Sequence, residues 1–94
     1  MTTPDCIALC DALTRAGMGS ALTTTSDGRI LCRLDGRGLY VDCWTHDLRW
    51  GQPNTRRVVI RDGRHGATLH IIDIEAGRGW ADRAAAAVVA AVVL

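Results

Sequence analysis

Several residue types are missing or scarce in this chain. Its 94 residues include no lysine, no phenylalanine, one tyrosine and one glutamate. No apolar run approaches the roughly 20 residues that a membrane span needs. Eleven arginines against ten acidic residues leave a net charge of +1, so charge indicates neither nucleic acid nor a membrane surface. These features exclude collagen, coiled-coil, low-complexity and transmembrane classes.

What remains is the composition of one folded domain. Apolar residues make up 48% of the chain and charged residues 22%, which is too apolar for a disordered chain. A chain of 94 residues has room for a single domain, residues 1–94. The use of arginine without lysine, with many alanines, glycines and valines, is typical of a GC-rich coding sequence. It indicates an actinobacterium or one of its phages as the source.

Apolar spacing divides the chain into two helices and five strands. Thr3 and Pro4 can begin a helix, and apolar residues then recur at helical spacing from Cys6 to Gly17. Alternating residues predict strands over 20–25, 29–34, 39–44, 57–61 and 67–74. Asp-Gly-Arg tripeptides, which begin at residues 27, 35 and 62, supply turns between strands. A last helix is predicted over Trp80–Leu94.

This order predicts an α+β fold of two layers. The first three strands form a meander and the last two a hairpin, giving an antiparallel sheet of about five strands with both helices on one face. The registers that bury an apolar face in the meander are Leu34 opposite Leu39, Cys32 opposite Val41, Ile30 opposite Cys43 and Leu22 opposite Cys32. In the hairpin they are Ile60 opposite Leu69 and Val58 opposite Ile71.

The last helix also predicts self-association. It carries no polar residue after Arg83, a valine stripe and a separate alanine face. The valine stripe can pack on the sheet of its own chain, while the alanine face permits close approach of a second helix. Since a domain of this size has a marginal core, we expect at least a homodimer.

The face of the sheet away from the helices is the predicted binding surface. By the registers above it carries Leu31, Arg33, Tyr40, Asp42, Trp44, Arg57, Val59, Arg61, His70 and Ile72. Its apolar residues are either exposed, or covered by the connection from Trp44 to Trp50 as a second small core. Tryptophan, tyrosine and arginine are enriched at interface hot spots. The residues predicted to bind a partner are Arg33, Tyr40, Trp44, Trp50, Arg57, Arg61 and His70.

An alternative partner for the same face is nucleic acid, because arginines there alternate with aromatic residues. The segment Gly77–Ala85, with Ala90 and Leu94, resembles the closing segment of double-stranded-RNA-binding domains. That resemblance implies a helix, three strands and a helix. It covers under a fifth of the chain, and Asp82 stands where that family has a basic residue, so its RNA contacts are not carried over.

The four cysteines are interpreted as buried core residues, because each falls on a predicted apolar face. The alternatives are a disulfide or redox role and a zinc site. Cys6 and Cys10 lie four residues apart on a helix, and Cys43 and His46 form a C-x-x-H pair. Residues 1–5 lack a basic region and no early apolar run follows, so we expect no secretory signal and a cytoplasmic protein with reduced thiols.

No set of residues predicts an enzyme. His46 and Asp47 are adjacent in a connection and could act as acid or base, but such pairs are more often turn residues. The sequence therefore predicts a non-enzymatic interaction module with no cofactor and no metal. Its expected partner is another protein, in the role of a host-directed inhibitor or adaptor if the source is a phage.

Overall fold

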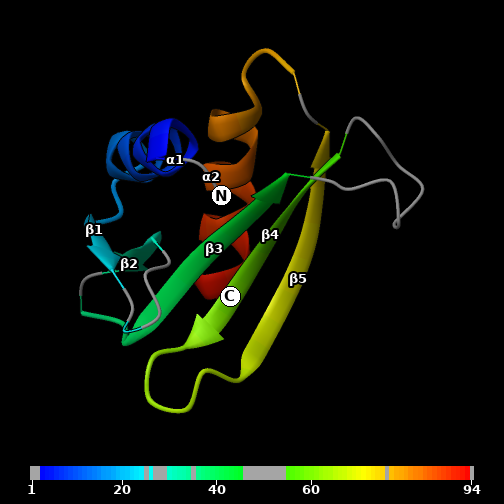
Figure 1. The fold of residues 1–94 in the computed structure, drawn as a ribbon. Coiled ribbons are helices and arrows are strands. Elements are labelled where there is room, and N and C mark those ends of the chain that lie inside the picture. Colours follow the sequence, from blue (N-terminus) through cyan, green and yellow to red (C-terminus); the bar gives the residue numbers. More distant parts are fainter. Residues whose placement is uncertain are drawn as a thin grey trace.

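The computed structural model describes residues 3–24, 26, 30–34, 36–45, 55–75 and 77–93, with backbone alone at 3–5, 44, 45 and 93. Its elements, in chain order, are α1 (Thr3–Arg15), β1 (Ser20–Thr24), β2 (Ile30–Leu34), β3 (Leu39–Thr45), β4 (Thr55–Asp62), β5 (Thr68–Glu75) and α2 (Trp80–Val93). Figure 1 shows their arrangement. The predicted order of helix, five strands and helix is confirmed, with boundaries that shift by one or two residues.

The strands form one antiparallel sheet in the order β1-β2-β3-β4-β5. Each strand therefore lies beside its neighbour in the chain, as short connections favour. In the view of Figure 1, α2 runs behind the sheet, and α1 packs on α2, β1 and β2. The predicted two-layer architecture, with both helices on one face, is confirmed.

The two helices share one core with the sheet. The predicted apolar stripe of α1 is buried, and α2 contributes its small residues and Val88. The strands contribute Cys32, Leu34, Val41, Cys43, Val58 and Ile60. Outside this core, Arg15 of α1 donates a 2.8 Å hydrogen bond to Asp82 of α2, which ties the exposed ends of the two helices together.

Glycine and a buried methionine end α1. Gly17 has a φ of +87°, a conformation that residues with a Cβ rarely adopt. The Met18 amide donates to Leu13 O at 2.9 Å and the Gly17 amide donates to Thr14 O at 3.0 Å, which is the Schellman pattern. Met18 is buried, so the chain turns from the helix directly into the core before β1 begins.

The predicted registers of the meander are confirmed where the ladders are described. Leu34 lies opposite Leu39 and Cys32 opposite Val41. Leu22 lies opposite Cys32 across β1 and β2. The described β2–β3 ladder has no pair at Ile30, and Cys43 lies opposite Val58 of β4.

The predicted register of the β4–β5 hairpin is wrong. Ile60 lies opposite His70, and Val58 opposite Ile72, because the register shifts between Ile60 and Arg61. This irregularity places Ile72 on the helix side, where it packs against the core, and leaves Ile71 exposed. Adjacent isoleucines at 71 and 72 make both registers equally apolar in sequence, so the packing of α2 on β5 decides between them.

Two arginines anchor the start of α2. The guanidinium of Arg56, on β4, lies 4.1 Å from the centre of the Trp80 ring. Arg83 donates to Arg78 O and to Glu75 O, each at 2.7 Å, and so holds both ends of the connection from β5. Among the described residues no helix is long and apolar enough to cross a membrane.

Candidate functional site

We call the sheet face opposite the helices the open face. The registers place on it Leu31, Arg33, Tyr40, Asp42, Arg57, Val59, Arg61, Ile71 and Asp73. Its centre is buried, because Leu31 is 5% exposed and Val59 and Asp42 are each 4% exposed. Of the two alternatives for this face, exposed or covered, the burial of Leu31 and Val59 contradicts the exposed one at these positions.

Asp42 is the buried charged residue of the described chain. It lies opposite Val59, with Arg57 and Arg61 each one pair away along the same face of β4. Burial of a carboxylate requires nearby compensation, and Arg33, on the other neighbouring strand β2, lies at the same spacing from Asp42 as these two arginines. The centre of the open face therefore contains a buried carboxylate with arginines on the neighbouring strands, and it is not a purely apolar patch.

A hollow of about 250 Å³ opens at one end of this face. Residues of β1, β2, β3, β4 and the β4–β5 turn line this hollow: Thr23, Thr24, Leu31, Tyr40, Arg61, Asp62, Gly63 and Gly66. Leu31 and the Tyr40 ring supply apolar walls, and the threonines, Arg61 and Asp62 supply hydrogen-bonding groups. A volume below that of typical ligand pockets suits one side chain of a partner rather than a large cofactor.

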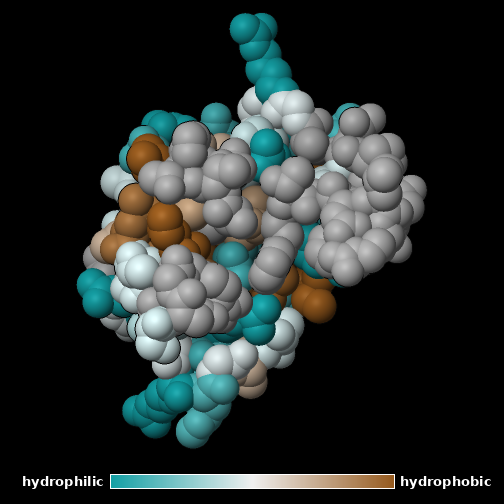
Figure 2. All heavy atoms as spheres, in the orientation of Figure 1, coloured by the Kyte–Doolittle hydropathy of each residue, from teal (hydrophilic) through white to brown (hydrophobic). Residues whose placement is uncertain are grey.

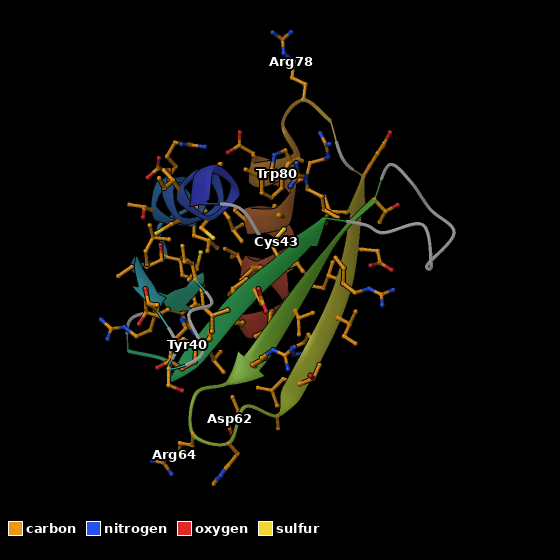
Figure 3. All side chains as sticks on the ribbon, in the orientation of Figure 1. Tyr40, Cys43, Asp62, Arg64, Arg78 and Trp80 are labelled. Atoms are coloured by element: carbon orange, nitrogen blue, oxygen red, sulfur yellow. The ribbon has the colours of Figure 1, made fainter. Side chains whose placement is uncertain are left out.

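Gly63 fixes one wall of the hollow. Its amide donates a 2.8 Å hydrogen bond to Gly38 O, which joins the β4–β5 turn to the β2–β3 turn. A Cβ at this position would lie 2.7 Å from Gly38 O and 2.8 Å from Cε2 of Tyr40. Figure 3 shows Tyr40 at the same end of the sheet as Asp62 and the turn. The missing side chain of Gly63 therefore allows the Tyr40 ring to lie against the turn.

The turn also orients Arg61 and Asp62. Asp62 accepts a 2.8 Å hydrogen bond from the Arg64 amide, and Gly66 N donates to Asp62 O at 2.8 Å. Arg61 donates through Nη1 to Thr68 Oγ1 at 3.2 Å. Its Nε is buried and has no hydrogen-bond partner among the described residues. Arg61, which lines the hollow, therefore has one buried donor, its Nε, without an acceptor in the part of the chain that the structure describes.

Arg57 is engaged within the sheet. It donates from Nε and Nη2 to the two carboxylate oxygens of Asp73 at 2.9 and 3.1 Å. The hydrogen bond to Asp73 raises the pKa of Arg57 above its usual value. This two-point contact joins β4 to β5, so the Arg57 guanidinium is shared with a neighbouring strand rather than directed at solvent alone.

The structure brings together only part of the predicted binding set. Arg33, Tyr40 and Arg61 share the open face, with Tyr40 opposite both arginines in the two ladders. The Trp44 backbone pairs with Arg57, and the Trp44 side chain and all of Trp50 lie outside what the structure describes. The placement of His70 is wrong, because the shifted hairpin register puts it on the helix side of the edge strand.

Sequence patterning missed most of the hollow. It places Thr23 and Thr24 in an edge strand, and Asp62, Gly63 and Gly66 in a turn without further role. The signal that could have found them is the third Asp-Gly-Arg tripeptide. It stands at the end of the strand that pairs with Tyr40, so its glycine had to lie near the only tyrosine.

The four cysteines are buried and free of disulfides. Cys6 donates to Ile30 O at 3.7 Å, Cys32 donates to Cys6 O at 3.6 Å, and Cys10 lies 3.2 Å from Ser20 Oγ. Burial, helped by the three other thiols, raises the pKa of Cys32 to about 12. The Cys32 thiol is therefore protonated at neutral pH, and its thiolate, the reactive form, is suppressed.

The zinc alternative has no candidate cluster in the described part of the chain. No group of three or more histidine, cysteine, aspartate or glutamate residues there could hold a metal ion. His46 and Asp47 lie outside the described residues, so the C-x-x-H pair and the acid–base pair both stay untested.

Comparison of this chain with protein-family models, with curated proteins and with solved structures found no match.

Proposed function

We propose that this chain is a non-enzymatic interaction module that binds a protein partner through the open face. In this proposal the hollow between β1, β3 and the β4–β5 turn receives one anchor side chain of the partner. The single observation that carries it is the hollow itself, which combines the Tyr40 ring, an apolar wall and the Arg61 guanidinium.

The guanidinium of Arg61 supports a partner with an acceptor oxygen. Arg61 lines the hollow and is half-buried, and its Nη1 already donates to Thr68. A carbonyl or carboxylate oxygen carried by the anchor residue would accept a further hydrogen bond from this guanidinium. Leu31 and Tyr40 would contact the apolar part of the same side chain.

Charge balance favours protein over nucleic acid as the partner. Asp73 binds Arg57, Asp42 lies between arginines at the centre of the face, and Asp62 lines the hollow. A surface that neutralises phosphates needs an excess of cations, and here carboxylates alternate with the arginines. Nucleic acid remains the second candidate because Arg33 and Tyr40 lie opposite each other on this face.

The proposed compartment is a reducing cytoplasm. Four thiols without a disulfide support it, since secreted domains of this size usually carry disulfides.

A capture experiment with matched variants tests the proposal. The wild-type chain, Tyr40→Ala, Arg61→Gln and the control Arg37→Gln are immobilised and exposed to lysate of an actinobacterium. The retained proteins are then compared by mass spectrometry. Arg37 is exposed in the β2–β3 turn and does not line the hollow, so its loss removes the same charge without touching the site. A partner should be retained by the wild type and by Arg37→Gln, and lost by the other two.

Two results would contradict the proposal. One is the absence of any protein that depends on both Tyr40 and Arg61. The other is tight binding of a short fluorescent RNA that weakens steeply with salt, which would favour the nucleic-acid alternative.

A further inference from the structure

The outer edge of β5 is unpaired in the described part of the chain. The strand order places β5 at one end of the sheet, and Figure 1 shows it at the margin opposite β1. The strand runs for eight residues, contains no proline or lysine, and packs on β4 and α2. Apart from the register shift at Leu69 and the acidic residues near its end, the strand carries none of the features that protect sheet edges, and it presents backbone donors and acceptors to a further strand.

Exposed apolar side chains accompany this edge. Leu69 is 50% exposed and Ile71 58% exposed, the two highest values among the large apolar residues described. Figure 2 shows apolar atoms at the margin where β5 runs. Leu69 is the residue without a β4 partner at the register shift, and with Ile71 it forms a small exposed apolar surface beside the free edge.

The charges along β5 have opposite signs at its two ends. Arg64 lies in the turn before the strand, and Asp73 and Glu75 lie near its end. The side chains of all three are exposed. A second copy that pairs in the antiparallel direction would bring the acidic end of each strand to the basic turn of the other. A parallel copy would bring like charges together.

We propose that two copies of this chain pair through their β5 edges, antiparallel and about a two-fold axis at His70, to form one ten-stranded sheet. In this register Leu69 of each copy lies opposite Ile71 of the other. Glu75 of each copy reaches the turn that carries Arg64 of the other. The apolar pairing and the charge pairing thus select the same register, which is the reason to choose a second copy as the occupant.

The first test is sedimentation of Ile71→Glu against two controls. By symmetry the substitution places two carboxylates in the interface, so it should weaken self-association by more than about tenfold. Ile7→Glu changes another exposed isoleucine, on α1, and Ala90→Glu changes the exposed alanine face of α2. Both controls should stay dimeric. A monomeric wild type, or dissociation by Ala90→Glu and not by Ile71→Glu, would overturn the proposal.

The second test is charge reversal across the interface. Glu75→Arg and Arg64→Glu should each weaken the dimer, and the double variant should restore it, because the unlike pair is re-formed in reverse. A double variant that is weaker than both single variants would show that these residues do not face each other.

The third test fixes the register and does not depend on affinity. His70→Cys, treated with the thiol oxidant diamide, should form a covalent dimer by joining the two symmetric thiols in a disulfide. Thr68→Cys is the matched control, because in this register its two copies lie about 13 Å apart along the strands, too far for a disulfide. Equal cross-linking of both variants, or of neither, would overturn the register. None of the three tests substitutes a residue that lines the hollow.

Discussion

At the scale of single residues, the absence of a Cβ at Gly63 matters both for the fold and for the candidate site. A methyl group there would lie within 3 Å of both Gly38 O and the Tyr40 ring, so backbone and ring must move. We expect Gly63→Ala to lower the free energy of unfolding by about 1–3 kcal/mol, measured by urea denaturation. An unchanged midpoint would mean that the two turns are not in contact.

Cys32 makes stability depend on alkaline pH. Its pKa is raised from 9.0 to about 12 in the folded state, so unfolded chains lose this proton first. The contribution of the protonated Cys32 thiol to the free energy of unfolding is full below pH 9. It is lost as pH rises from 9 towards 12. Urea midpoints across this range should fall more steeply for the wild type than for Cys32→Ala. Equal slopes would show that the Cys32 thiol ionises as easily in the folded chain as in the unfolded one.

At the scale of elements, α2 presents two valines of unequal burial. Val88 is fully buried, whereas Val92 is partly buried against the same core. Val88→Ala should destabilise by about 2 kcal/mol and Val92→Ala by about 1 kcal/mol, because the transfer and cavity terms grow with the apolar area that each side chain buries. Denaturant midpoints of both variants equal to that of the wild type would mean that α2 does not pack on the sheet.

The β4–β5 hairpin shows where the spacing of apolar residues is not enough to predict a strand register. In the meander, pairing Leu34 with Leu39 also places Cys32 opposite Val41 on the same face, and this register is confirmed. In β5, apolar residues stand at 69, 71, 72 and 74, so two registers serve equally well. The observed register is the one that places Ile72 and Ile74 on the side of the sheet where α2 packs.

At the scale of the whole molecule, pairing through β5 makes thermal stability depend on concentration. Association stabilises the folded state by mass action, so the melting temperature should rise by about 5 °C between about 2 and about 200 μM chain. Ile71→Glu should remove this rise without lowering the melting temperature of the dilute protein. Melting curves that superpose at all concentrations would contradict a dimer of any geometry.

Local patterns in the sequence were enough to predict the element order, the antiparallel meander and the burial of the cysteines on α1, β2 and β3. Each of these follows from local spacing, turn residues and the need to bury one face of each element. Three features depend instead on tertiary packing: the hairpin register, the burial of Leu31, Asp42 and Val59, and the hollow beside Tyr40. These features join strands and turns far apart in the chain. Their geometry depends on how two layers and two turns pack together, which no local pattern encodes.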